Sequence, residues 1–557
     1  MLKEFIPKSV SCFKEGYTFF LFKKDLFAGL TVGIVALPLA LAFAIASGVG
    51  PERGLYTAII AGFLISFLGG SRVQIGGPTG AFVVVVYDII SRQGYEGLVV
   101  ATLIASVMLI VLGIARLGNL IKYVPYPLVT GFTTGIAVVI FSTQMKGFFG
   151  FQIENVPSNF IGQWHSYFIA FPTFHGPTLL VASSTLAMIL LIKRYFVVLP
   201  WGVLAIVLST FVCFAFNIPV ATVASHFGEL PRSLPSLAFP QFSLAWEDLT
   251  PLMHDAITIA LLAGIESLLS ASIADGMTGF RHRSNCELIA QGIANFGSAL
   301  FGGIPATGAI ARTATNVKTG ARTPVAGMIH AVVLFLILLY LGPIVSLVPL
   351  PALSAVLVMV AWNMSEVNHF YRLLKAPLGD VAILLTAFFL TVFVDITVAV
   401  ELGMILAAFL FIKRIVDYSK IAKVSSLLEN EEEVVDKDAL SDKDIPSGVA
   451  VYEINGPFFF GIADNLNDVL HHLERPPKVF ILRMRYVPAI DTTGIYVLQQ
   501  FYSRCAKERT HLILSGVRGK AAESINKYGI ATLVGIENIF PHIDAALQHA
   551  NTLLTTK

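Results

Sequence analysis

The chain has 557 residues, of which 55% are hydrophobic and only 13% are charged. Soluble domains carry about 25% charged residues, so this composition excludes one large soluble enzyme and indicates a membrane protein. The formal net charge of +2 is too small for the basic surface of a nucleic-acid-binding protein.

Apolar segments follow one another from residue 25 to about residue 416. The first run, residues 26–46, is too long for the hydrophobic region of a cleaved signal peptide, so we interpret it as a membrane span. A spanning helix needs roughly 20 apolar residues, and fewer where a broken helix is buried in protein. The sequence predicts a polytopic α-helical membrane protein with fourteen segments, which start near residues 25, 54, 79, 97, 124, 177, 199, 253, 287, 308, 323, 349, 378 and 398.

Basic residues decide the orientation of these spans. An even number of spans puts both termini on one side, and cytoplasmic loops carry an excess of Lys and Arg. With a cytoplasmic N-terminus, the outside loops hold only Arg53, Arg92, Lys146 and Arg232. The inside loops and span ends hold the larger basic set: Lys23, Lys24, Arg72, Arg116, Lys122, Lys193, Arg194, Arg281, Arg283, Lys318, Arg322, Arg372, Lys375, Lys413 and Arg414. We therefore expect a multi-pass protein of the cell (inner) membrane with both termini in the cytoplasm.

Two short segments interrupt the apolar pattern at matching positions. Residues 76–81 are Gly-Gly-Pro-Thr-Gly-Ala, and residues 302–309 are Gly-Gly-Ile-Pro-Ala-Thr-Gly-Ala. They open the third and tenth segments, so the fourteen segments divide into 7+7 inverted repeats, each with one broken half-helix. Such paired interruptions mark the binding site of a transporter, and helix N-termini attract anions. The alternative is that these glycines only allow helices to pack closely.

Charged residues inside the spans are the next functional signal. Glu266 lies within an apolar segment, where a carboxylate is costly and indicates function, and Ser270 shares its helix face. Arg312 lies in the first turns of the tenth segment, where a guanidinium adds positive charge to a helix N-terminus. The structural alternatives are that Glu266 is hydrogen-bonded to a neighbouring helix and that Arg312 forms an ion pair with a carboxylate such as Glu266.

The chain changes character near residue 417. Residues 428–444 are rich in Asp and Glu, which is typical of a solvated linker. Strands are expected after it at residues 449–454, 478–484 and 512–516, and helices around residues 461–474, 493–506 and 519–528. Strands that alternate with helices predict a small α/β sheet. The expected domains are a cytoplasmic N-terminus (1–24), a transmembrane transport domain (25–416), an acidic linker (417–446) and a C-terminal α/β domain (447–557).

Several stretches resemble a known family. Residues 29–44, 54–56, 76–81 and 302–316 are similar to the SulP family of anion transporters, which includes the sulfate permeases. The C-terminal domain resembles a STAS domain, with Asp-Thr-Thr-Gly at residues 491–494 as its signature loop. Within the family, the chain most resembles the enteric bacterial C4-dicarboxylate member, and the similarity lies in residues 264–269, 275–279 and 360–366.

The resemblance implies a fold split into core and gate regions, a homodimer, and an elevator-like movement of the core. It implies a substrate site between the starts of segments three and ten, formed by Phe43, Thr79, Ala81, Gly308, Ala309, Ala311 and Arg312. Glu266 matches the family's acidic coupling position, and Ser270 lies one turn from it. Leu39 stands where many eukaryotic relatives have Gln, and Ala311 replaces a serine of many relatives, so the pocket is less polar and a sulfate assignment is weaker.

The STAS loop is a candidate regulatory site. Asp491, Thr492 and Thr493 open a helix, where an ordinary N-cap is the simplest interpretation. Related soluble domains use this loop as a phosphorylation switch, usually on serine. Threonine leaves that chemistry available, but the adjacent Asp491 disfavours added negative charge, so a docking or folding role is favoured.

We therefore expect a secondary active transporter of small anions, which are a C4-dicarboxylate such as succinate, or sulfate or bicarbonate. Its coupling ion is expected to be the proton. The expected partners are the anion, protons, the lipid bilayer, a second copy of the chain and a cytosolic partner of the STAS domain, with no nucleic acid. The sequence predicts no enzyme activity, cofactor or metal, and its four cysteines are far apart. The alternatives are a passive anion channel or exchanger, a voltage-responsive motor, sodium-coupled bicarbonate or sulfate uptake, and a signalling scaffold.

Overall fold

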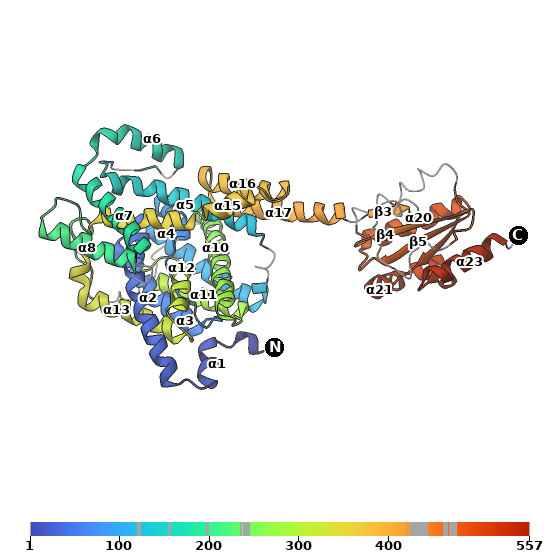
Figure 1. Cartoon of the computed structure of the whole chain (residues 1–557), viewed down its shortest axis with the longest axis horizontal. Helices are drawn as coiled ribbons and strands as arrows, with labels where there is room; N and C mark the ends of the chain where they lie inside the picture. Colours follow the sequence, from blue (N-terminus) through green and yellow to red (C-terminus); the bar gives the residue numbers. More distant parts are fainter. Residues whose placement is uncertain are drawn as a thin grey trace. The chain divides into compact units, whose positions relative to one another are not determined.

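The computed structural model describes residues 2–119, 124–153, 156–157, 159–195, 200–233, 237, 246–418, 420–423, 444–459, 466 and 476–555. The chain divides into two compact units, Met1–Ala407 and Ala408–Lys557. The first unit is helical and the second is an α/β unit with a central sheet (Figure 1). Each unit has its own hydrophobic core.

Helices make up the first unit. They are α1 (Lys8–Lys14), α2 (Phe19–Ala46), α3 (Pro51–Leu68), α4 (Gly80–Ile114), α5 (Tyr126–Phe149), α6 (Phe160–Ala170), α7 (Gly176–Tyr195), α8 (Trp201–Ala215), α9 (Val223–Phe227), α10 (Trp246–Thr278), α11 (Ser284–Leu300), α12 (Ile310–Lys318), α13 (Val325–Val345), α14 (Leu350–Met364), α15 (Val367–Leu373), α16 (Leu378–Phe393) and α17 (Ile396–Tyr418), the last of which continues into the second unit.

The fourteen predicted segments all coincide with helices. Segments three and four are the two parts of α4, which breaks at Gly94, where φ is 68°. Segments one, two and five to fourteen are α2, α3, α5, α7, α8, α10, α11, α12, α13, α14, α16 and α17. Among the described residues, 7 helices are long and apolar enough to cross a membrane by themselves. The shorter segments, such as α12, meet the same requirement only because they are buried in protein.

The two interrupted motifs become a pair of short strands, each followed by a helix. Strand β1 (Gly76–Gly77) pairs antiparallel with β2 (Thr307–Gly308), with Gly76 opposite Gly308. Helix α4 begins three residues after β1, and α12 begins two residues after β2. The antiparallel pairing of corresponding strands is the arrangement expected for two repeats of opposite topology.

Helices of the first unit pack in two groups. One group contains α2, α3, α4, α10, α11, α12 and α13, and the other contains α5, α7, α8, α14 and α16. The first group holds both half-helices, so we call it the core and the second group the gate. Gly80, at the start of α4, lies at the boundary, where an added Cβ would be 2.8 Å from the Met364 sulfur of α14 and 3.1 Å from Ile140 of α5.

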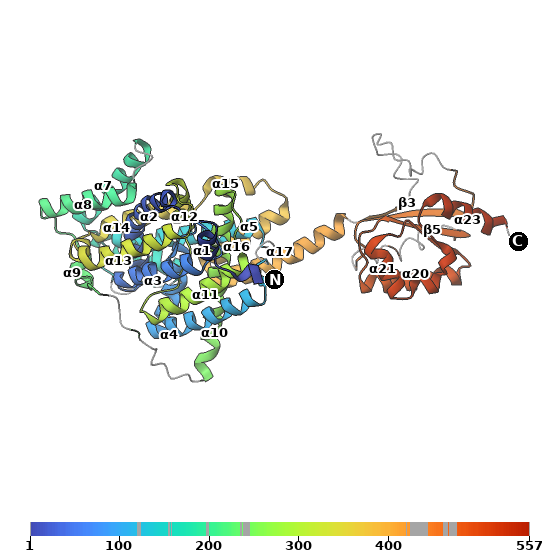
Figure 2. The ribbon, with the colours of Figure 1, turned by 90° about the horizontal axis from the view of Figure 1, so that it is seen from below.

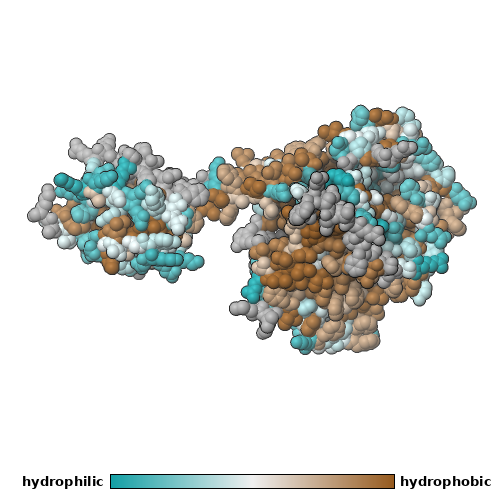
Figure 3. All heavy atoms as spheres, turned by 180° about the vertical axis from the view of Figure 1, so that it is seen from behind, coloured by the Kyte–Doolittle hydropathy of each residue, from teal (hydrophilic) through white to brown (hydrophobic). Residues whose placement is uncertain are grey.

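Large apolar side chains cover much of the outside of the first unit. Phe211 and Phe214 on α8 and Tyr340 on α13 are each more than 60% exposed. Figure 3 shows a broad hydrophobic surface on one face of the helical unit. Soluble monomers do not expose apolar surface on this scale, so this surface faces lipid.

The second unit contains a five-stranded sheet in the order β3-β4-β5-β6-β7. Its strands are β3 (Lys420–Lys423), β4 (Val449–Asn455), β5 (Val479–Tyr486), β6 (His511–Ser515) and β7 (Ile539–Phe540). Strand β3 is antiparallel to β4, and the other neighbours are parallel. Helices α20 (Thr492–Lys507) and α21 (Gly519–Lys527) lie on one face, and α23 (Ile543–Thr555) lies on the other (Figure 2). The short α22 (Ile530–Val534) packs against α20 and α21.

The three predicted strands and the two later predicted helices of this unit are confirmed. The helix expected at residues 461–474 lies outside the described residues, apart from Leu466. Residues 420–423, which were expected to be linker, form β3 at the edge of the sheet. The acidic part of the linker, residues 424–443, also lies outside the described residues.

Candidate functional site

Two helix N-termini meet at the paired strands of the core. Thr79 is the N-cap residue of α4, and Ala309 is that of α12. The Ala309 N–H donates a 2.8 Å hydrogen bond to the Ile75 carbonyl, which ties the start of α12 to the strand before α4. The first N–H groups of a helix have no partner within the helix and attract anions. The two dipoles therefore act on one region.

Helix α10 contacts both half-helix regions through side chains one turn apart. Glu266 is buried and accepts a 2.9 Å hydrogen bond from the Thr79 hydroxyl. Ser270, also buried, donates to the Thr313 hydroxyl on α12 at 3.2 Å. Thr313 in turn accepts a 3.0 Å hydrogen bond from the Ile75 N–H. Both residues expected at the coupling position thus link α10 to the half-helices.

Arg312 is buried, with a relative exposure of 2%. One terminal nitrogen donates a hydrogen bond to the Pro78 carbonyl, and the other, Nη1, has no hydrogen-bond partner. Gly77 has a φ of +146°, and an added Cβ there would lie 2.7 Å from Nη1. No ion pair within 4 Å joins Arg312 to Glu266 among the described residues, so the alternative in which they form a structural bridge is not observed.

The other residues expected at the site differ in exposure. Phe43, Ala81, Gly308 and Ala309 are buried. Gly308 admits the Gln74 side chain, whose amide nitrogen occupies the position of a Cβ. Ala311 alone in this expected set is exposed. Arg312 therefore points into the core, while the residue before it on α12 presents a small, apolar side chain on the accessible side.

A buried polar network beneath β1 was missed by the sequence analysis. Gln74 donates to the Ser267 hydroxyl at 2.9 Å, and Ser267 donates to Glu287 Oε1 at 3.0 Å. Glu287 also accepts from the Gln291 amide at 3.0 Å and from the Gly70 N–H at 2.8 Å. Its exposure is 0%. The ninth segment was expected to start near residue 287; α11 begins at Ser284, and Glu287 in its first turn is buried by its contacts with Ser267 of α10 and Gly70.

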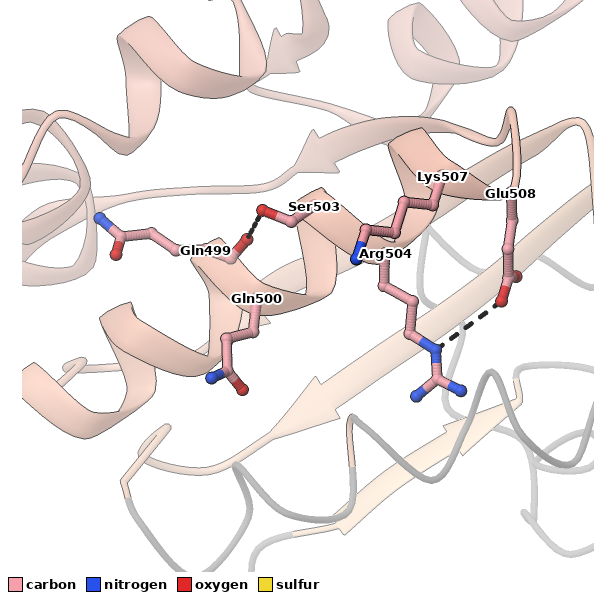
Figure 4. Close-up of a pocket in the computed structure, with 6 residues that line it drawn as sticks. All are labelled: Gln499, Gln500, Ser503, Arg504, Lys507 and Glu508. Atoms are coloured by element: carbon pink, nitrogen blue, oxygen red, sulfur yellow. Dashed lines mark hydrogen bonds and ion pairs between the residues drawn. The ribbon is translucent and has the colours of Figure 1, made fainter.

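The STAS loop has the geometry of an ordinary N-cap. The Asp491 carboxylate accepts a 2.7 Å hydrogen bond from the Gly494 N–H at the start of α20. Thr492 and Thr493 are exposed. At the other end of α20, Gln499, Gln500, Ser503, Arg504, Lys507 and Glu508 line a shallow polar surface pocket (Figure 4). Arg504 and Glu508 form a 3.7 Å ion pair there. Within the described part of the chain, no cluster of His, Cys, Asp and Glu side chains is arranged to hold a metal ion.

The sequence matches two protein-family models. Residues 22–387 match the sulfate permease family, and residues 441–546 match the STAS domain. The "Putative sulfate transporter YvdB" of Bacillus subtilis is 42% identical over 95% of this chain and 98% of its own length. The "Bicarbonate transporter BicA" of Picosynechococcus is 28% identical over 94% of each chain.

Solved structures agree with this assignment. The murine Slc26a9 anion transporter in the inward-facing state superposes with a TM-score of 0.86, covering 98% of this chain and 94% of that one at 18% identity, which shows the shared fold. The transmembrane domain of cyanobacterial BicA, 29% identical, superposes with a TM-score of 0.61 over 70% of this chain. The chain belongs to the sulfate permease (SulP) family, a family of transporters, and has a helical membrane transport domain followed by a STAS domain.

Proposed function

We propose that this protein is a secondary active transporter of small anions, driven by the proton gradient. The observation that carries the proposal is the contact between Thr79 and Glu266. It joins a buried carboxylate to the N-cap of α4, in the region where α12 brings Arg312 and its unpaired nitrogen. An anion attracted by the helix dipoles and Arg312 would bind next to a group that can carry a proton.

The relatives bear on the choice of anion. Two of them are named for sulfate and bicarbonate transport. The resemblance of residues 264–269 and 360–366 to the enteric C4-dicarboxylate member adds succinate to the candidates. Ala311, the exposed residue at the start of α12, leaves the accessible side of the site less polar than a serine would. We therefore propose a small mono- or dianion of this group as the substrate, bound between the starts of α4 and α12.

The two packing groups support an elevator movement. The core carries both half-helices, so displacement of the core against the gate would carry the site from one side of the membrane to the other. Glycine at position 80 gives a close, side-chain-free approach of α4 to the gate helices. We further propose a homodimer with both termini in the cytoplasm of the cell (inner) membrane, as the basic loops and the family resemblance imply, and a cytosolic partner for the STAS domain.

Sodium is the second candidate for the coupling ion. Glu266 and Thr79 present a carboxylate and a hydroxyl oxygen side by side, and hard cations prefer oxygen ligands. A passive channel has no use for such a group, so it is the weaker alternative. A signalling scaffold would leave the buried charges of the membrane unit without a role.

Uptake by purified protein in liposomes tests the proposal. Labelled sulfate, bicarbonate and succinate are each supplied with and without an inward proton gradient, in sodium-containing and in sodium-free buffer. Accumulation of one anion above equilibrium that requires the proton gradient and persists without sodium supports the proposal. Accumulation that requires sodium instead assigns sodium as the coupling ion. Fluxes that never exceed equilibrium, together with large single-channel currents, would show a channel.

A further inference from the structure

A buried histidine lies next to the anion site and has no role in the mechanism above. His330, on α13, has an exposure of 0%, and neither ring nitrogen has a hydrogen-bond partner. The Gly327 backbone, one turn earlier, lies beside the ring without the geometry of a hydrogen bond. Buried polar groups are normally paired, because an unpaired one costs free energy that an apolar side chain avoids. An imidazole in this state points to a function.

Small residues bring His330 against the strand that leads into α4. A Cβ added to Gly62 on α3 would lie 3.4 Å from the His330 ring and 3.2 Å from the Gly76 carbonyl of β1. The ring and β1 therefore flank the same glycine. Arg312 Nη1 approaches the next residue of β1, Gly77. An added Cβ at Gly77 would also lie 3.5 Å from Ala58, one turn before Gly62 on α3, so the imidazole and the unpaired guanidinium nitrogen lie near successive turns of α3.

The positive charge of Arg312 acts on two buried groups that can carry protons. Arg312 is buried close enough to both Glu266 and His330 for its charge to act on each of them through the low-dielectric interior. From α3 the groups that face α13 here are Gly62 and the unpaired Ser66 hydroxyl, neither of which is charged. From α2, the residue that faces His330 is Gly33, which is also uncharged.

One further carboxylate lies near the start of α13. Asp25 of α2 accepts hydrogen bonds from the backbone N–H groups of Arg322 and Thr323, at 2.8 and 3.1 Å, and from the Thr323 hydroxyl at 2.5 Å. It also accepts a 3.2 Å hydrogen bond from the Tyr17 hydroxyl, so its partners are Tyr17 and the chain that enters α13. Of these charged groups, Arg312 is therefore the one whose charge acts on His330.

We propose that His330 is a second proton-carrying group of the anion site, which takes up a proton when a bound anion neutralises Arg312 and releases it when the anion leaves. With the site empty, the guanidinium charge opposes a second positive charge in the same buried region. An anion held at Arg312 removes that electrostatic opposition, while the cost of burying the charged ring remains, so each of the anion and the proton favours binding of the other. The same linkage makes acid pH favour anion binding. The inference rests on the proposed anion transport and adds a proton carrier to Glu266.

Isothermal titration of the full-length protein measures this linkage directly. Sulfate is the first probe because it has no titrating proton between pH 6 and 8, and succinate, corrected for its own titration, is the second. Titrations in buffers of different ionisation enthalpy give the number of protons taken up per anion bound. We expect wild type and Glu266→Gln to take up protons, and His330→Gln to take up fewer than wild type. Linkage to one proton changes anion affinity by up to about tenfold per pH unit, and His330→Gln should lose that part of the pH dependence.

Control variants test whether any change in proton uptake is specific to His330. His165→Gln replaces an exposed histidine on α6 and should keep wild-type proton uptake. His330→Asn is a second variant, and melting temperature checks that each variant is folded. Equal proton uptake in wild type and His330→Gln would overturn the inference, as would a Glu266→Gln protein that takes up no proton. Failure of the wild type to accumulate anion in a proton gradient would instead overturn the proposed function.

Discussion

Thr79 and Glu266 lie 187 positions apart in the sequence and form a 2.9 Å hydrogen bond in the centre of the core. The hydroxyl of Thr79, the N-cap residue of α4, donates to the carboxylate of α10, so the protonation state of Glu266 is coupled to the helix end proposed to hold the anion. A charged carboxylate accepts this bond more strongly than a protonated one. The contact thereby links proton and anion chemistry.

Glu266→Gln is expected to abolish uphill uptake driven by a pH gradient, because the amide cannot carry a proton and still fills the same space. Downhill anion exchange should survive. Proteoliposome uptake with an inward proton gradient measures the first property, and counterflow without a gradient measures the second. Accumulation that continues unchanged in the variant would show that Glu266 is not the coupling residue.

Arg312→Ala is expected to lower anion affinity while the protein still inserts and folds. A hydrogen bond to a charged group contributes about 1.5–3 kcal/mol, which corresponds to roughly 10-fold to 150-fold in affinity. Calorimetric titration of the anion measures the loss. Arg312→Lys is the matched control, since it keeps the charge and should retain part of the affinity. Wild-type affinity in Arg312→Ala contradicts the prediction, and an unfolded variant supports a structural role.

Gly77→Ala is expected to weaken anion binding at least severalfold. The backbone there has a φ of +146°, and the new methyl group would lie 2.7 Å from Arg312 Nη1, so the guanidinium must move. Gly320→Ala is the matched control: φ is +99° and no atom lies within 4 Å of the new Cβ. Both changes strain the backbone by about 1–3 kcal/mol, and the melting temperatures of the two variants compare this loss of stability. Equal affinities in the two variants would show that the position of Arg312 does not matter.

Truncation after about residue 420 is expected to preserve anion binding. The residues proposed to hold the anion all lie between positions 43 and 312, within the first unit. Loss of the STAS domain should mainly reduce transport rate, dimer stability or expression. Calorimetric binding and liposome flux on the truncated protein test this. A stably folded truncation with no affinity for the anion would show that the domain shapes the site.

Cys505 in the STAS domain is expected to resist alkylation in the folded protein. The thiol is 1% exposed, and burial raises its pKa to about 12. The folded state therefore holds this proton more tightly than the unfolded state, so its contribution to stability is lost as pH rises from about 9 toward 12. Mass spectrometry after iodoacetamide treatment at pH 8 should find Cys505 modified only in denaturant. Labelling of the native protein at the rate of a free thiol would contradict the burial.

Local sequence was sufficient for the membrane segments and the two interruptions. Apolar length predicts a span because lipid offers no hydrogen-bond partner, and Gly-Pro motifs predict a break because they cannot continue a helix. Both effects act within a few residues, so the segment positions and the breaks at residues 76–81 and 302–309 follow without tertiary information. Strands β4, β5 and β6 of the STAS sheet followed in the same way from short apolar runs, whereas β3 and β7 did not.

Which groups meet was decided only by the tertiary structure. Glu266 and Arg312 are both conspicuous in the sequence, and pairing them is a natural hypothesis, but Glu266 is bound by Thr79 and Arg312 by the Pro78 carbonyl. Glu287 was not singled out in the sequence, and its hydrogen bonds with Gly70, Ser267 and Gln291 appear only in the folded chain. His330 gave no signal at all.

The physical reason is the range of the interactions. Hydrophobicity and backbone preference are properties of a short stretch of chain, so the sequence by itself determined the family, the spans and the paired half-helices. Burial and hydrogen bonding depend on which side chains of the other repeat pack against a residue in the folded chain. Gly62, Gly77 and Gly308 leave room for side chains from distant helices, and only the folded chain shows that those side chains belong to His330, Arg312 and Gln74.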